Sequence, residues 1–131
     1  MHDFRVIFPP LAVIRAGVAA VWLYEGLWCK LLGRMRSQVE VVSAVPGLGP
    51  RFGLPLLKIV GVVELSFALW VVTGVAPGTC AISQTTLLVV LNANGLLWAR
   101  KIIHDPAGMV VKNIAFLVLV WICGAVPKGG P

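Results

Sequence analysis

Four long apolar segments follow one another along the chain and alternate with short polar or glycine- and proline-containing stretches. We place them at residues 11–32, 55–75, 81–98 and 109–126. At about 1.5 Å per residue, helices of these lengths suit a hydrocarbon core of roughly 30 Å. The pattern predicts an all-α integral membrane protein, in which a single domain over residues 1–131 forms a bundle of four transmembrane helices.

Proline and aspartate mark where some of these helices begin. Pro9 and Pro10 directly precede the first span, where proline is best tolerated. Asp105 and Pro106 predict an N-cap followed by proline in the first turn of the fourth helix. The connection between the second and third spans, APGTC, is predicted to be a tight turn.

The stretch between the first two spans has a helical pattern of its own. Met35, Val39 and Val42 recur at helical spacing, opposite charged and polar residues. This predicts a short helix at the membrane interface that ends at Pro46. An ordinary basic loop is the alternative.

The composition supports a membrane protein and argues against other classes. Of the 131 residues, 59% are hydrophobic and 12% are charged, whereas soluble domains have about 45–50% apolar and about 25% charged residues. The net charge of +6 comes from basic residues in short loops and at the ends of the apolar segments. This distribution suits contact with anionic membrane lipids and argues against a nucleic-acid partner.

The same basic residues predict the orientation in the membrane. Arg34, Arg36 and Arg51 lie between the first and second spans. Arg100 and Lys101 follow the third span, whereas the connection between the second and third spans has no basic residue. The positive-inside rule therefore places the basic loops in the cytoplasm and both termini on the extracytoplasmic side.

Each of the four spans carries carboxylate or amide side chains within membrane depth. Glu25 and Glu64 lie in the first and second spans. Asn92 and Asn94 lie in the third, and Asn113 lies in the fourth. Counted from the cytoplasmic ends, all lie roughly 6–14 Å deep. Because unsatisfied polar groups are costly in hydrocarbon, we expect one shared polar cluster in the cytoplasmic half of the bundle.

The two carboxylates of this predicted cluster are the candidate catalytic residues. Glu25 and Glu64 can act as a general acid and base or can share a proton, with the asparagine amides as hydrogen-bond partners. The structural alternative is that Lys30, Lys58 or the amides satisfy both carboxylates, so that the cluster holds the helices together without chemistry.

Arg15 and the aromatic residues beside Glu25 extend the candidate site. Arg15 lies about one turn from the outer surface, where it either snorkels to the interface or pairs with an acidic or carbonyl group of a ligand. Trp22, Tyr24 and Trp28 flank the glutamate and can line a pocket for an aromatic ring such as a quinone, although such residues more often pack. The candidate ligand-binding residues are Arg15, Tyr24, Trp28, Asn92, Asn94 and Asn113.

The sequence gives no support for a metal or haem site. Cys29, Cys80 and Cys123 form neither a CxxC pair nor a zinc spacing. His2 and His104 lie outside the spans, so an intramembrane haem is not expected. No phosphate-binding glycine loop or dinucleotide fingerprint occurs. Cys80 and Cys123 both fall near the outer face, where a disulfide between them is one alternative.

Four sequence segments, one for each span, carry a family resemblance. YEGLWCKLLGR in the first span, LLKIVGVVEL in the second, LNANGLLWAR in the third and DPAGMVVKN before the fourth resemble the DoxX-like family of small bacterial membrane proteins. The resemblance implies a four-helix, multi-pass protein of the bacterial inner membrane. The wider DoxX and DoxD group includes a membrane subunit of a thiosulfate:quinone oxidoreductase, which implies redox chemistry near the quinone pool. The residues that match the family pattern are Arg15, Glu25, Lys30, Glu64, Asn94 and Asn113.

These observations lead to one main hypothesis and two alternatives. The main hypothesis is a membrane protein that binds a lipophilic small molecule, above all a quinone, through the polar cluster and serves an oxidoreductase system with a separate redox partner subunit. One alternative is a self-contained acid/base enzyme, an isomerase or cyclase acting on an isoprenoid or sterol-like substrate. The other is a structural membrane anchor or small transporter. We expect no covalently bound cofactor, and the small surface that four helices bury favours a homo-oligomer.

Overall fold

The computed structural model describes residues 10–32, 34–47 and 49–125, which form helices joined by short connections. The described part contains no strand. Its elements are the α-helix α1 (Leu11–Leu23), the π-helix η2 (Tyr24–Leu31), and the α-helices α2 (Arg36–Ser43), α3 (Gly49–Thr73), α4 (Pro77–Trp98) and α5 (Pro106–Ala125). Four helical segments are long and apolar enough to cross a membrane, α1 and η2 together making the first. The predicted all-α fold with four membrane spans is therefore confirmed.

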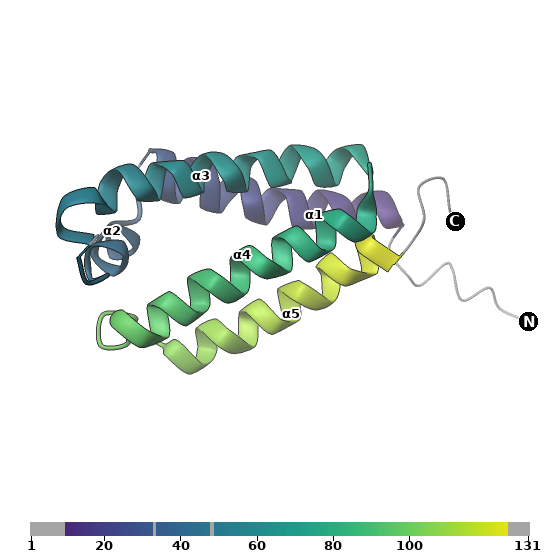
Figure 1. The fold of residues 1–131 in the computed structure, drawn as a ribbon. Coiled ribbons are helices and arrows are strands. Elements are labelled where there is room, and N and C mark those ends of the chain that lie inside the picture. Colours follow the sequence, from purple (N-terminus) through teal and green to yellow (C-terminus); the bar gives the residue numbers. More distant parts are fainter. Residues whose placement is uncertain (1–9, 33, 48, 126–131) are drawn as a thin grey trace, which may run out of the picture.

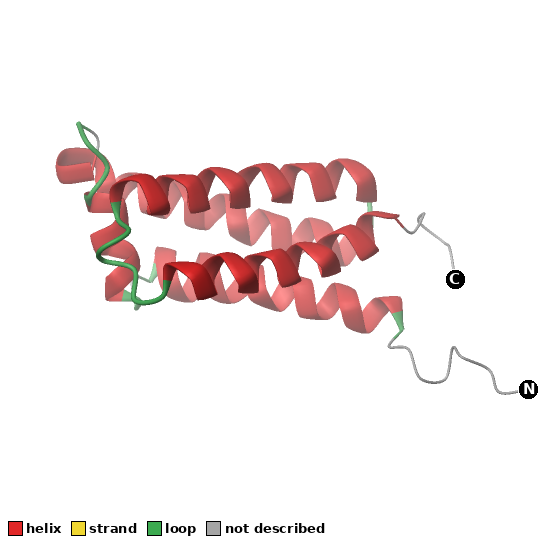
Figure 2. Cartoon of the chain, turned by 90° about the horizontal axis from the view of Figure 1, so that it is seen from below, coloured by secondary structure: helices red, strands yellow, loops and turns green. Residues whose placement is uncertain are grey.

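The four spans are arranged as two pairs of antiparallel neighbours. The continuous span of α1 and η2 packs against α3, and α4 packs against α5 (Figure 1). The two pairs come together at the end that carries the α3–α4 turn and diverge toward the end that carries α2 and the α4–α5 connection. We call these the turn end and the α2 end. The view from below shows the four spans lying side by side, with the chain entering and leaving at the turn end (Figure 2).

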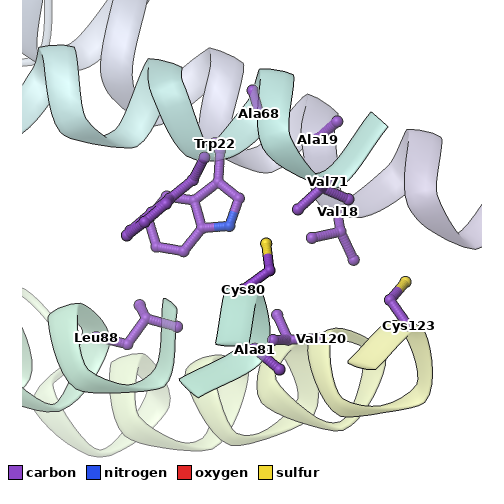
Figure 3. Packing of buried hydrophobic residues seen from close by; sticks show 11 residues of the cluster. Val18, Ala19, Trp22, Ala68, Val71, Cys80, Ala81, Leu88, Val120 and Cys123 are labelled. Carbon is purple, nitrogen blue, oxygen red and sulfur yellow. The ribbon is translucent and has the colours of Figure 1, made fainter. Parts of the chain in front are cut away.

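Most of the apolar core lies where the pairs converge. Trp22 is nearly fully buried, and its ring lies edge-on to Phe67 and Phe116 at centroid distances of 5.2 and 5.5 Å. These contacts join α1 to α3 and α5, because the three aromatic residues come from different helices. Figure 3 shows Trp22 pointing from the upper pair toward α4 and α5. The buried hydrophobic cluster comprises Val18, Ala19, Trp22, Phe67, Ala68, Val71, Cys80, Ala81, Leu88, Val120 and Cys123.

The outer surface of the bundle is apolar, as a lipid-facing surface must be. Leu69, Leu97 and Val111 are each about two-thirds exposed although they lie within long helices. In water such a surface would favour aggregation or association with another apolar surface. Together with the four long spans, it supports an integral membrane protein.

The second and third spans extend further than the sequence predicts. Helix α3 begins at Gly49 and continues through Pro55, the predicted first residue. Proline removes one backbone hydrogen bond, and this occurs near the α2 end, where the freed carbonyl is close to the membrane surface. Helix α4 begins at Pro77 because proline fits the first turn of a helix, so much of the predicted APGTC turn is helical.

The α3–α4 turn is shorter and more constrained than expected. Gly74 has φ +69° and ends α3 in the left-handed conformation that glycine adopts readily. Ala76 follows with φ +44°, which is uncommon for a residue with a side chain. The indole N–H of Trp70 donates to the carbonyl of Val75 at 2.6 Å, which stabilises the turn from within the preceding helix.

The other predicted helix signals are found in the structure. The backbone N–H of Gly108 donates to Oδ1 of Asp105 at 3.0 Å, which confirms the N-cap of α5. The short interfacial segment is helical as α2, and its end before Pro46 agrees with the predicted stop. Both described ends of the chain, at residues 10 and 125, lie at the turn end, as an even number of spans requires. Which side of the membrane this end faces stays a prediction from the basic loops.

Candidate functional site: a buried charged cluster

The candidate site begins with an irregularity in the first span. From Tyr24 to Leu31 the α-helix becomes a π-helix, in which backbone hydrogen bonds join residues five apart. Glu25 and Lys30 are five residues apart, so π-helical winding brings their side chains onto one face, whereas α-helical winding would turn them well apart. The ammonium of Lys58 in α3 donates to the carbonyl of Leu31 at 3.1 Å and so satisfies one carbonyl at the end of this helix.

Two glycines allow η2 to lie directly against α3. A Cβ atom added to Gly26 would lie 2.7 Å from the carbonyl oxygen of Gly61 and 2.9 Å from the amide nitrogen of Leu65. A Cβ atom added to Gly61 would lie 2.9 Å from the carbonyl oxygen of Gly26. The backbones therefore touch, as small residues permit in membrane helix pairs. This close approach brings Lys30 on η2 to Glu64 on α3.

The charged cluster, defined here as Glu25, Lys30 and Glu64, is a pair of carboxylates around one ammonium. Nζ of Lys30 lies 2.6 Å from Oε1 of Glu64 and 3.3 Å from Oε2 of Glu25. The side chains of Lys30 and Glu64 are 7% and 3% exposed, whereas that of Glu25 is 34% exposed. The side-chain amide of Gln38, from α2, donates to the same Oε2 of Glu25 at 2.8 Å. The cluster therefore runs from the bundle interior to its surface beside α2.

The arrangement has the chemistry of a proton- or polar-ligand-binding site. With both carboxylates ionised, the cluster carries one excess negative charge, which a proton or a hydrogen-bond donor would stabilise. Oε1 of Glu64 contacts Nζ of Lys30 at 2.6 Å and has no further hydrogen-bond partner among the described residues. Lys30 can donate to a ligand oxygen, and Glu25 can exchange protons with solvent because it is partly exposed.

The asparagines predicted to join the cluster form a separate pair. The side-chain amide of Asn113 in α5 donates to Oδ1 of Asn92 in α4 at 2.9 Å, and Asn92 donates to the carbonyl of Leu88. Asn94 is bonded to the carbonyl of Val90 in its own helix. Among the described residues, no hydrogen bond joins these amides to either glutamate. The single polar layer expected from depth is therefore divided between the two helix pairs, which diverge toward the α2 end.

Tyr24 and Trp28 lie on the outer face of η2. Their exposed fractions are 49% and 48%, so they face lipid beside the cluster and do not line an enclosed pocket. The guanidinium of Arg34 lies 5.7 Å from the ring centroid of Trp28. Arg15 lies at the other end of the span, where its guanidinium packs against Gly74. The remaining predicted residue of the first span, Trp22, is buried in the core.

Sequence reasoning missed the hydrogen bonds of two glutamines. Gln38 belongs to the interfacial helix, and only the docking of that helix on the bundle brings it to Glu25. Gln84 is buried in α4, where its Oε1 accepts from the indole N–H of Trp22 at 2.7 Å. A buried glutamine on a membrane span is itself a signal of an interhelical hydrogen bond, but it does not identify the partner.

The thiols and histidines give no metal site within the part of the chain that the structure describes. No group of three metal-ligating side chains occurs there. Cys29, Cys80 and Cys123 are buried free thiols. His2 lies outside the described residues.

The fold, the lipid-facing surface and the buried charges define a multi-pass integral membrane protein with a polar site inside its helix bundle. The family model of the DoxX-like family matches residues 19–121. The chain therefore belongs to the DoxX-like family, in agreement with the resemblance seen in its four spans. No curated protein and no solved structure matches the chain.

Proposed function

We propose that this membrane protein binds a quinone at the charged cluster and serves an oxidoreductase system of the bacterial inner membrane together with a separate redox subunit. The observation that carries the proposal is the buried ion pair of Glu64 and Lys30, linked to the partly exposed Glu25. Buried charges within membrane spans mark ligand or proton pathways more often than they stabilise a fold.

The residues of the cluster fit the polar head of a quinone. Lys30 supplies a donor for a carbonyl oxygen, and the carboxylates supply acceptors for a hydroxyl. Tyr24 and Trp28 lie beside the cluster on the lipid-facing surface, where an aromatic ring can be held by stacking. A quinone supplies two-electron chemistry that is coupled to proton uptake. Glu25 connects the buried carboxylate to the surface beside α2, which is the direction from which protons would be replaced.

The test is to measure which lipophilic molecules remain bound to the purified protein. Organic extracts of wild-type protein, Glu64→Gln and Glu40→Gln are compared by mass spectrometry. Glu40→Gln is the matched control, because Glu40 lies on the exposed face of α2. We expect a quinone in wild type and Glu40→Gln and at least about tenfold less in Glu64→Gln, the factor for a lost hydrogen bond to a charged group. Size-exclusion chromatography and circular dichroism verify that each variant is folded.

Two outcomes would contradict the proposal. The first is equal quinone content in folded wild type and Glu64→Gln, which would separate binding from the cluster. The second is an absence of quinone in wild type purified with added ubiquinone or menaquinone. Retention of an isoprenoid with turnover in the absence of an electron donor would instead support the acid/base enzyme.

A further inference from the structure

A small cavity lies at the turn end, at the opposite end of the first span from the charged cluster. Its volume is about 10 Å³, which is roughly the space that one water molecule or one oxygen atom needs. Residues from α1, α3, α4 and α5 line it, among them Arg15, Gly74, Cys80, Gln84 and Cys123. Figure 3 shows the two cysteines on their separate helices at this end of the core.

Arg15 directs an unsatisfied donor into this region. Its Nη2 atom is buried and makes no hydrogen bond to the residues that the structure describes. A Cβ atom added to Gly74 would lie 3.1 Å from Cζ, Nη1 and Nη2 of Arg15 alike, so the guanidinium plane lies flat against this glycine. The guanidinium of Arg15 therefore packs at the turn end, against the residue that directly follows α3. A buried N–H of a charged group without an acceptor is unfavourable unless a ligand or water supplies one.

The charge of Arg15 has no counterion among the described residues at this end. The described carboxylates all lie at the α2 end or deep in the cluster with Lys30: Glu25, Glu40, Glu64 and Asp105. Arg15 and Glu25 are ten residues apart on one span, which is roughly 15 Å along the helix axis. At this distance, the cluster does not neutralise the guanidinium by direct contact.

The other polar groups around the cavity are already engaged or are weak partners. Nε2 of Gln84 donates to the carbonyl and Sγ of Cys80, and its Oε1 accepts from Trp22. The indole N–H of Trp70 donates a hydrogen bond to the carbonyl of Val75. A ligand atom in the cavity would thus be recognised mainly by the guanidinium of Arg15.

We propose that this cavity receives one anionic oxygen of a phosphate or carboxylate group, bound by Nη2 of Arg15. The cavity has space for a single oxygen, so the rest of the ligand lies outside it, toward the membrane surface at the turn end. Two sources share this chemistry: the phosphate of an anionic lipid head group in the adjacent leaflet, which, unlike that of phosphatidylcholine, has no ammonium group of its own to balance its charge, and a small soluble anion. This site goes beyond the quinone proposal, because it uses neither the same residues nor the same end of the bundle.

The test measures thermal unfolding of the purified full chain against two probes. In detergent, sodium phosphate or sodium acetate replaces sodium chloride at constant ionic strength. In nanodiscs, phosphatidylcholine is compared with mixtures that contain phosphatidylglycerol. A ligand that binds the folded state raises the unfolding temperature in a concentration-dependent way. A response in detergent identifies a soluble anion, and a response confined to phosphatidylglycerol identifies a lipid head group.

Two variants and a matched control show whether the rise in unfolding temperature comes from binding in the cavity. In Arg15→Gln, the half-saturating concentration should rise about ten- to hundredfold, the factor for losing a hydrogen bond to a charged group. Arg51→Gln removes the same charge at the α2 end, where Arg51 is exposed beside Phe52, and should respond as wild type does. Cys123→Met fills the cavity from α5 while it keeps the arginine, and it should also lose the response.

The proposal is overturned if wild type responds to neither probe, or if folded Arg15→Gln responds with the wild-type half-saturating concentration. If Arg15→Gln does not fold, Cys123→Met decides: a wild-type response in this variant overturns the proposal. Because the charged cluster is intact in all these proteins, quinone retention should be unchanged. A failure here is therefore distinguishable from a failure of the proposed function.

Discussion

The turn end and the α2 end of this bundle are built on different principles. At the turn end, α1, α3, α4 and α5 converge on the buried hydrophobic cluster around Trp22. Toward the α2 end the helix pairs diverge, and buried ionisable groups lie between η2 and α3. A membrane protein gains little from moving apolar side chains out of lipid, so the core around Trp22 is held by close packing and by interhelical hydrogen bonds. The charged cluster has a desolvation cost that packing at the other end helps to offset.

The contrast between the two ends also indicates which residues serve stability and which serve the proposed function. The hydrogen bond between Trp22 and Gln84 is enclosed by apolar side chains and connects the two helix pairs. The charged cluster lies within one pair and reaches the surface through Glu25 and Gln38. Substitutions in the core around Trp22 should therefore change stability without changing quinone retention, whereas substitutions in the charged cluster should change both.

The largest effect is expected for Lys30→Met. It leaves Glu64 buried without its cation, which should lower the free energy of unfolding by about 3–5 kcal/mol. Titration with sodium dodecyl sulfate in mixed micelles measures this quantity. Lys58→Met is the matched control, since Lys58 is exposed and donates to a backbone carbonyl, and it should cost about 1 kcal/mol.

A double substitution tests whether this loss comes from the ion pair. Lys30→Met combined with Glu64→Leu removes both buried charges, so most of the lost stability should return. If the double variant is less stable than Lys30→Met alone, the pair is not the source of the effect.

Gly26→Ala should have the next largest effect, near the upper end of the roughly 1–3 kcal/mol range for overpacking. The added Cβ would meet backbone atoms of α3 on two sides, at 2.7 and 2.9 Å, and neither can rotate away. Gly17→Ala is the control, because nothing lies within 4 Å of its added Cβ. The same titration in mixed micelles compares them. Equal stability of the two variants would show that the contact between η2 and α3 is loose.

Trp22→Phe tests how much the hydrogen bond between Trp22 and Gln84 contributes to stability. It leaves Oε1 of the buried Gln84 without a donor, and we expect a loss of about 2 kcal/mol in the free energy of unfolding. Quinone retention should stay at the wild-type level. Trp121→Phe breaks an exposed hydrogen bond to Thr85 and should cost less, about 0.6 kcal/mol. A loss of quinone in folded Trp22→Phe would contradict the separation of the two ends.

The smallest effect is expected for the asparagine pair. Asn92→Leu removes the hydrogen bond between α4 and α5 and should lower stability by about 0.6 kcal/mol, the average for such bonds in membrane bundles. Asn94→Leu removes a bond within a single helix and should be neutral or stabilising. If Asn92→Leu also abolishes quinone retention, the asparagine pair belongs to the functional site after all.

The spans and their number follow from the sequence, because long apolar segments have few alternatives in a membrane. The composition of the charged cluster is only partly predictable. Depth indicates Glu25 and Glu64, but a spacing of five residues places Glu25 and Lys30 on different faces of an α-helix. Local amino-acid composition does not predict a π-helix, because this winding depends on how α3 packs against the first span. The contacts of Gln38 and Gln84 depend likewise on helix docking.

The π-helix makes the charged cluster depend on the number of residues in one segment. A π-helix accommodates an extra residue per turn relative to an α-helix. Deleting one residue between Tyr24 and Lys30 would allow the segment to wind as a regular helix that still crosses the membrane. Glu25 and the lysine would then be four residues apart, and α-helical winding of about 100° per residue turns them by about 400°, which again places them on one face. A homologue one residue shorter at this place would therefore keep both the fold and the alignment of its two charges in a regular α-helix, whereas a spacing of five requires the π-helix, and segment length alone would indicate which homologues contain it.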